Sequence, residues 1–176
     1  MALFGLLRRR PHERTGFELY GAAVQAAREP AYYLELGVAD STAGRFELVS
    51  AHVALLIRRL RRFASPEGDG LAQAVFDAMF SDMDVNLREM GVGDLGVGKR
   101  VRFLWESFHG RAEAYGAALD SGDAAGLAAA LGRNVWAGTE PPAGAPEALA
   151  ARMRAMAAVL EGQPLDSLLR GQARFA

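Results

Sequence analysis

Two long amphipathic stretches meet at a short glycine-rich segment, and this arrangement predicts a helical hairpin in the middle of the chain. Before the segment, apolar residues recur every three or four positions, at Ala72, Phe76, Met79, Met83, Leu87 and Met90. After it, the same spacing runs through Val97, Val101, Leu104, Phe108, Ala112, Tyr115 and Leu119. Because this spacing places side chains on one face of an α-helix, the segment from Met83 to Arg102 is predicted to form an elbow between two helices.

The first sixty residues carry signals for three further helices. Thr15 and Glu18 have the spacing of a capping box, which predicts a helix that begins near Thr15 and ends before Pro30. Pro30 suits the first turn of a second, short helix, which Gly37 would end. An apolar stripe then predicts a long helix over about residues 44 to 63. The members of this stripe are Phe46, Val49, Val53, Leu56 and Leu60.

The remaining sequence predicts helices separated by polar turns. Residues 65 to 70, SPEGDG, are typical of a turn between helices. Asp123 is placed to cap a helix that follows the break at SGD, and residues 138 to 146 form a predicted loop with three prolines. A last long helix carries apolar residues at helical spacing. These are Leu149, Met153, Met156 and Leu160.

The fold class follows from what these patterns include and omit. No alternating apolar and polar run is bounded by turns, so no β-sheet is predicted. A chain of 176 residues has the length of one domain. We therefore predict an all-α fold, a single compact bundle of about six to seven helices, with two long helices joined by the glycine-rich elbow. Residues 15 to 170 are assigned to this domain, and residues 1 to 14 to a flexible basic segment before it.

Composition argues against several classes of function. The formal net charge of -1 argues against specific nucleic-acid binding, which needs a clearly basic face to displace counterions from phosphates. The absence of cysteine removes disulfides and thiolate metal sites and fits a reducing compartment, so a cytoplasmic location is expected. No apolar run approaches the roughly 18 residues that span a bilayer, so the chain is not expected to be an integral membrane protein.

Charge is distributed unevenly along the chain. Residues 1 to 62 carry ten arginines against six acids, whereas residues 63 to 94 carry one arginine against seven acids. Four arginines end the long helix before residue 63, namely Arg58, Arg59, Arg61 and Arg62. They form either a solvated face that offsets the helix dipole or a docking site for an acidic or membrane partner. The opening MALFGLLRRR is either a frayed terminus or a peripheral membrane contact.

The elbow contains two phosphate-binding patterns that lack their structural context. Gly91, Gly93 and Gly96 satisfy GxGxxG, and residues 93 to 99 satisfy GxxxxGK. Both patterns act in turns that follow a β-strand, whereas a helix is predicted here. In addition, Arg100 stands where the second pattern needs Ser or Thr to bind magnesium. We therefore expect no nucleotide cofactor.

Metal and catalytic sites are not predicted either. Asp82, Asp84 and Asn86 have the opening spacing of a calcium loop, but Leu87 replaces the required glycine. The three histidines are scattered, and His52 adjoins an apolar stripe, where a hydrogen-bonded core histidine is expected in preference to a metal or haem ligand. Because no serine lies in a nucleophile motif, the chain is not expected to be an enzyme.

The short elbow is expected to bring polar residues of the first helix close to basic residues at the start of the second. The first helix carries a polar stripe of Asp82, Asn86 and Glu89, and the second begins with Lys99, Arg100 and Arg102. In one interpretation these groups pair internally and the glycines let two charged helix ends approach closely. In the other, some of them stay open and bind a client protein. The nearby aromatic residues, assigned mostly to the core, offer one or two candidates for a client groove; they are Phe103, Trp105, Phe108 and Tyr115.

The elbow sequence and three other segments resemble one protein family. DMDVNLREMGVGDLGVGKRV, residues 82 to 101, looks like the signature of the ubiquinol-cytochrome c chaperone family. Residues 44 to 60, 109 to 119 and 131 to 136 resemble the same family. Together the resemblance covers most of residues 30 to 137.

This resemblance implies a function and a set of partners. It implies a non-catalytic, all-helical assembly factor that binds newly made cytochrome b and assists assembly of the ubiquinol-cytochrome c reductase (bc) complex. A ribosome or a small helper protein, and a peripheral position on the cytoplasmic face of the inner membrane, are further expectations. The alternative is a membrane- or ribosome-docking adaptor that uses the arginine clusters. The expected partner-binding residues are Asp82, Asp84, Asn86, Arg88, Glu89, Gly91, Gly93, Asp94, Gly98, Lys99 and Arg100.

Overall fold

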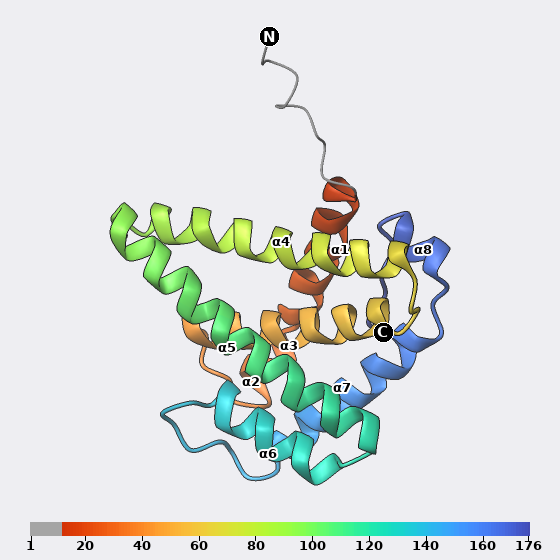
Figure 1. Cartoon of the computed structure of the whole chain (residues 1–176). Helices are drawn as coiled ribbons and strands as arrows, with labels where there is room; N and C mark the ends of the chain where they lie inside the picture. The colour runs from red at the N-terminus through yellow and green to blue at the C-terminus, as the bar shows by residue number, and fades with distance from the viewer. Residues whose placement is uncertain (1–11) are drawn as a thin grey trace.

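The computed structural model describes residues 12–176, which form helices and loops without a strand (Figure 1). The expectations for residues 1 to 11 lie outside the described residues. The helices are α1 (Glu13–Ala27), α2 (Pro30–Leu34), α3 (Thr42–Arg61), α4 (Pro66–Glu89), α5 (Asp94–Ser121), α6 (Ala124–Val135), α7 (Ala145–Glu161) and α8 (Leu165–Leu169). Since α2 and α8 have only five residues each, the longer helices of the described chain build the bundle, and the predicted all-α fold is confirmed.

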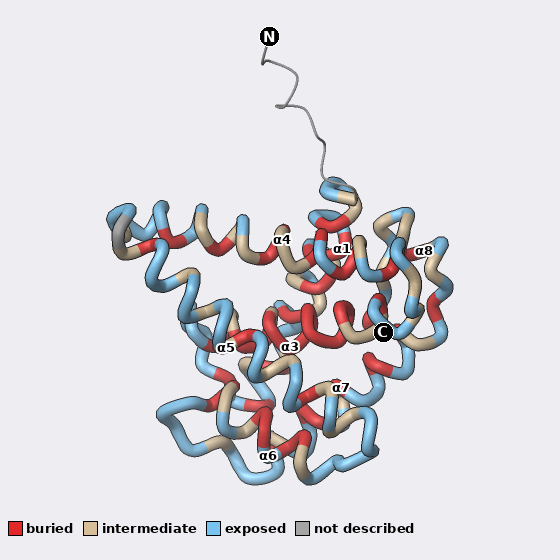
Figure 2. The backbone as a smooth tube through the Cα atoms, viewed as in Figure 1, coloured by how far each residue is buried: buried red, intermediate tan, exposed pale blue. Residues whose placement is uncertain are grey.

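Helix α3 runs through the centre of the bundle. All residues from Ser50 to Ile57 are buried, and Figure 2 shows this helix as the most continuously buried element. Helices α1, α4, α5, α6 and α7 all pack against it. The sequence predicts a one-sided stripe, but a helix enclosed by neighbours buries small residues such as Ala51 and Ala54 on its remaining faces.

Helices α1 and α4 cross at a glycine. A Cβ atom added to Gly16 would lie 2.6 Å from the backbone carbonyl of Ala74, a distance that packed atoms do not reach. Gly16 therefore allows the two helices to approach almost backbone to backbone. Further along, the hydroxyl of Tyr20 donates a hydrogen bond of 2.8 Å to Asp82, which fixes the direction of α4 across α1.

Two helix starts differ from the sequence prediction. Helix α1 begins at Glu13 rather than Thr15, and its N-cap residue, His12, has φ 64° and makes no side-chain cap. The predicted capping box is therefore wrong, and Glu18 accepts a hydrogen bond from Arg14 instead. Residues 66 to 70 form the first turn of α4 rather than a turn between helices. Ser65 caps this helix, because its side chain accepts from the amide of Gly68 at 3.1 Å.

The C-terminal third closes the bundle. The side chain of Asp123 accepts from the amide of Gly126 at 2.8 Å, which confirms it as the cap of α6. Helix α7 starts at Ala145, inside the predicted loop, and α8 was not predicted at all. Beyond residue 170, Phe175 is buried in the core and its ring lies 5.6 Å from that of His52. The packed domain thus includes the last residues of the chain.

Candidate functional site

The elbow between α4 and α5 projects from the rest of the molecule (Figure 1). Helix α4 ends at Glu89, and Gly91 follows with φ 80°, a left-handed conformation that glycine adopts without strain. The amide of Val92 then donates back to the carbonyl of Leu87 at 3.1 Å, which closes the end of the helix. Gly93 precedes the first residue of α5, so the link between the two long helices is only four residues, 90 to 93.

Three predicted site residues meet at the elbow. The guanidinium of Arg88 donates to Asp84 at 2.7 Å on its own helix and to Asp94 at 2.5 Å across the link. Both carboxylates and the arginine are substantially exposed to solvent. The small cluster therefore orients the start of α5 against the end of α4 and adds little stability.

The predicted pairing across the elbow is not the one observed. Asp82 accepts from Tyr20 of α1, and the side-chain amide of Asn86 donates to the backbone carbonyl of Asp82 at 2.8 Å. Arg102 pairs within α5, with Glu106 at 3.0 Å. The interpretation in which the polar stripe pairs with the basic group is thus wrong. Asp82, Asn86 and Arg102 are engaged by α1 or by local contacts, and the remaining members form no pair across the elbow among the described residues.

The elbow glycines do not serve close packing, contrary to the sequence prediction. A Cβ atom added at Gly91, Gly93 or Gly98 would meet no described atom within 4 Å. At Gly96 it would meet only a methyl group of Val92, at 3.0 Å. The close approach predicted here is found instead at Gly16, and at the elbow only Gly91 is required, for its backbone conformation.

Cations and apolar groups remain open at the elbow. Lys99 and Arg100 are exposed, and neither makes an ion pair with a described residue. Met90 is 54% exposed and Phe103 66%, so the same segment also carries two large exposed apolar side chains. Glu89, Gly93 and Gly98 are exposed as well. This combination can contact a protein segment through both charge and apolar area.

An aromatic cluster, defined as Phe76, Phe80, Trp105, Phe108 and His109, fills the angle between the two helices. Phe108 is buried, as expected, whereas Trp105 is 45% exposed and stacks on His109 with ring centroids 4.0 Å apart. Of the four aromatic residues predicted to lie mostly in the core, Phe108 and Tyr115 are buried, whereas Trp105 and Phe103 are exposed. The i to i+4 spacing of the α5 pair was the available signal for their contact.

A buried ion pair fastens α5 to α3, and the sequence analysis missed it. Arg111 donates to Glu47 at 2.6 Å, although the two are 64 positions apart. Burial raises the pKa of Glu47, and the adjacent guanidinium opposes that shift. One oxygen of Glu47 and the hydroxyl of Ser50 have no hydrogen-bond partner among the described residues. No local spacing signals a pair so distant in sequence.

The arginines at the end of α3 are mostly engaged within the molecule. Arg58 pairs with Asp120 of α5 and with Glu161 of α7, and Arg59 pairs with Glu161 at 3.2 Å. Their side chains are only 15% and 13% exposed. A solvated basic face, the first of the two interpretations, is therefore wrong for these two residues. Arg61 is exposed and has no ion pair with a described residue.

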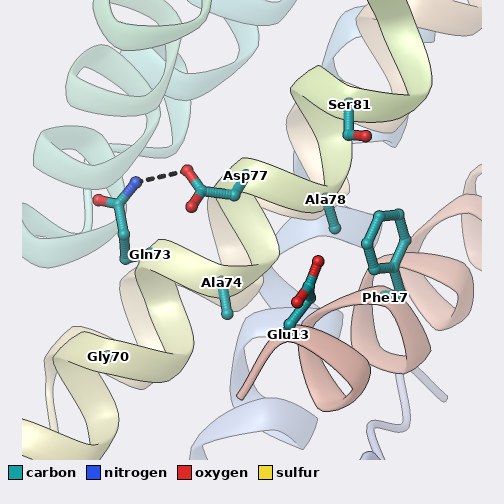
Figure 3. Close-up of a pocket in the computed structure, with 8 residues that line it drawn as sticks. All are labelled: Glu13, Phe17, Gly70, Gln73, Ala74, Asp77, Ala78 and Ser81. Atoms are coloured by element: carbon teal, nitrogen blue, oxygen red, sulfur yellow. Dashed lines mark hydrogen bonds between the residues drawn. The ribbon is translucent and has the colours of Figure 1, made fainter. Parts of the chain in front are cut away.

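A pocket of about 300 Å³ lies between α1 and α4, away from the elbow (Figure 3). It is lined by Glu13, Phe17, Gly70, Gln73, Ala74, Asp77, Ala78 and Ser81. The alanines form its floor, and the ring of Phe17 stands beside Ala78. The side chain of Gln73 donates to Asp77 at 2.8 Å, on the side of α4 that points away from Glu13 and Phe17. Sequence reasoning did not find this pocket, because it arises only where two helices cross.

The structural context of the glycine patterns is that of an elbow between helices. Helix α4, not a strand, precedes Gly91, which agrees with the rejection of a dinucleotide turn. Among the described residues, no group of three or more His, Cys, Asp or Glu side chains is placed to hold a metal ion. In the same part of the chain, no helix combines the length and the apolar character needed to cross a membrane.

Comparison with known proteins gives two matches to this fold and sequence. A family model described as ubiquinol-cytochrome C chaperone matches residues 34–175. The crystal structure of the Cbp3 homolog from Brucella abortus is similar with a TM-score of 0.81 and 38% sequence identity. That match covers 92% of this chain and 88% of the Brucella chain. No curated protein matches the sequence.

Proposed function

The chain belongs to the ubiquinol-cytochrome c chaperone family, and from this premise we propose that it binds newly made cytochrome b through the α4–α5 elbow. Membership makes it an assembly chaperone of the ubiquinol-cytochrome c reductase, the bc complex. The family points to an assembly factor without catalysis. Cytochrome b as the client, and the elbow as its binding surface, are the parts of the function that we propose.

The open composition of the elbow is the observation that supports this surface. It projects from the bundle and combines the free cations Lys99 and Arg100 with the exposed side chains of Met90 and Phe103. A surface that combines large exposed apolar groups with unpaired charges is more typical of a protein-binding site than of an ordinary solvent-facing helix. The ion pairs of Arg88 and the bond from Tyr20 hold the two helices in place around this surface.

We further propose that the chaperone acts at the cytoplasmic face of the inner membrane, with a ribosome or a small helper protein as a second partner. The adaptor alternative receives less support, because Arg58 and Arg59 are committed to Asp120 and Glu161. An adaptor based on this group would have to break internal ion pairs before it could dock.

Complementation of a deletion strain tests this proposal. Loss of the gene should deplete the bc complex and shorten the lifetime of cytochrome b, as measured by haem spectra and pulse-chase labelling. Normal levels of both would contradict the assembly function. Into this strain we would introduce the double variant Lys99→Glu/Arg100→Glu. It should lower recovery of cytochrome b with the purified chaperone by about tenfold, a change of roughly 1.4 kcal/mol.

A matched double variant separates the elbow from general charge effects. Arg61 and Arg133 are exposed and form no ion pair with a described residue, so Arg61→Glu/Arg133→Glu changes the net charge equally. The control should complement the deletion fully. Equal loss of cytochrome b in both double variants, at unchanged melting temperature, would show that the elbow is not the client surface.

A further inference from the structure

The pocket between α1 and α4 owes its shape to the tight helix crossing beside it. Because Gly16 brings α1 against the backbone of Ala74, the next residue, Phe17, is carried over the edge of α4. Its ring is 45% exposed, although it borders the apolar floor formed by Ala74 and Ala78 (Figure 3). A large aromatic side chain that is exposed to solvent beside an apolar surface provides apolar area that a partner can bury.

The walls of the pocket carry negative charge. Glu13 from α1 contributes an exposed carboxylate beside Phe17, and none of the lining residues is basic. The start of α4 adds two exposed acids, Glu67 and Asp69, next to Gly70 of the lining. A ligand that complements this surface must join an apolar side chain to positive charge, since an anionic ligand would be repelled.

We propose that this pocket is a second protein-binding site, which takes an apolar side chain flanked by arginine or lysine from a basic amphipathic segment of a partner protein. The apolar side chain packs between Phe17 and the alanine floor. The flanking cations lie against Glu13 and the acidic first turn of α4. Charge complementarity between this acidic rim and a basic segment selects the occupant.

This site is separate from the proposed client surface. The pocket borders α4 from Gly70 to Ser81, and the four-residue link of the elbow begins at Met90. At 1.5 Å per residue, the helix places about 18 Å between Ala78, which lies beside the Phe17 ring, and Met90, so a side chain in the pocket does not overlap a partner at the exposed groups of the elbow. The inference does not depend on cytochrome b being the client.

A labelled peptide tests the chemistry of the pocket. The probe is the acetylated, amidated peptide RLLRRLLRRLLR, and its counterpart ELLEELLEELLE has the same apolar pattern with the opposite charge. Fluorescence anisotropy with the full chain should detect binding of the basic peptide and none of the acidic one. Affinity should fall severalfold between 50 and 300 mM salt, because the contributing charges are exposed.

Paired variants locate the binding. Phe17→Ala and Glu13→Lys should each weaken binding at least fivefold. Their controls, Leu34→Ala and Glu113→Lys, truncate an exposed apolar side chain and reverse an exposed carboxylate away from both proposed surfaces, and they should change affinity less than twofold. All four side chains are exposed, and melting temperatures verify that each variant is folded. Absence of binding, or equal losses in variants and controls, would overturn the proposal.

A crosslink gives a second, independent measure of position. The chain has no cysteine, so Ser81→Cys introduces one thiol at the pocket and Ser121→Cys one at the exposed end of α5. A basic peptide with a maleimide at its terminus should label the first variant at least fivefold faster than the second. Equal rates would place the peptide elsewhere and refute the assignment.

Discussion

His52 is a buried histidine whose hydrogen bonds fix its protonation. Its Nδ1 lies 2.7 Å from the carbonyl oxygen of Leu48, which can only accept, so Nδ1 carries the proton. Its Nε2 lies 3.2 Å from the hydroxyl of Tyr32 and accepts from it. The predicted core histidine is confirmed, and both ring nitrogens are used by the fold rather than left for a metal or haem.

This residue should make the fold sensitive to acid. Burial lowers the pKa of His52 to about 4, from 6.5 in the unfolded chain, while the Leu48 carbonyl partly opposes the shift. The unfolded state therefore binds the proton first as pH falls. The stabilising contribution is complete above about pH 6.5 and declines towards pH 4, by up to about 3 kcal/mol.

Urea unfolding at pH 7, 5.5 and 4.5 measures this effect. His52→Gln keeps hydrogen-bonding groups but removes the buried ring, so its free energy of unfolding should be lower at pH 7. Because glutamine does not titrate, this free energy should also change less between the three pH values. Parallel pH profiles for the parent and the variant would show that His52 is not the group responsible.

At the scale of the element, the glycines of the elbow should respond differently to the same substitution. Gly91 has φ 80°, so Gly91→Ala forces a side chain into a left-handed conformation and should cost about 1 to 2 kcal/mol. Gly98 lies within α5 with open space around it, so Gly98→Ala should stabilise by about 0.5 to 1 kcal/mol. Urea unfolding compares the two, and stabilisation by both would contradict the left-handed cap.

Gly98 also connects stability with function. A glycine on an exposed face of a helix costs stability without serving any described contact. If the client backbone approaches α5 at this point, Gly98→Ala should lower recovery of cytochrome b although the chaperone itself is more stable. Recovery of cytochrome b with this variant is measured in the same complementation strain.

Elements were predicted well where the signal is local, and poorly where contacts are distant. The apolar spacing of α4 and α5 and the cap at Asp123 lie within a few residues, and the structure confirms them. The capping box at Thr15 failed because α1 begins two residues earlier, at Glu13, so Thr15 lies inside the first turn and not at the N-cap. The five-residue α8 is too short to show periodicity.

In the candidate site too, contacts between residues close in sequence were predictable, and contacts between different helices were not. The ion pair of Asp84 and Arg88 follows from i to i+4 spacing and is present. The partners of Asp82 and Arg111 come from other helices, Tyr20 and Glu47, so no sequence pattern indicates them. The family resemblance rests on the order of residues in the elbow, so it does not depend on these contacts.

At the scale of the whole molecule, one ion-pair network joins the ends of α3, α5 and α7. Glu161 accepts from Arg58 at 3.1 Å and from Arg59 at 3.2 Å, and Asp120 accepts from Arg58 and Arg62. Arg59 also donates to the carbonyl of Gln163 at 2.7 Å and lies over the ring of Phe63. The network holds together helices that are far apart in sequence.

Removing the charge of Glu161 should therefore destabilise the entire fold. Glu161→Gln leaves the mostly buried guanidinium of Arg59 without a carboxylate partner, whereas Arg58 keeps Asp120. This loss should cost about 1 to 3 kcal/mol, because the pair is partly exposed and breaking it costs less than breaking a fully buried one. The control, Glu106→Gln, removes an exposed i to i+4 pair with Arg102 and should cost at most about 0.5 kcal/mol. Urea unfolding followed by both tryptophan fluorescence and helical circular dichroism measures the two costs. Coincident transitions would show that the network acts on the whole bundle, whereas equal costs in the two variants would show that it contributes no more than a surface pair.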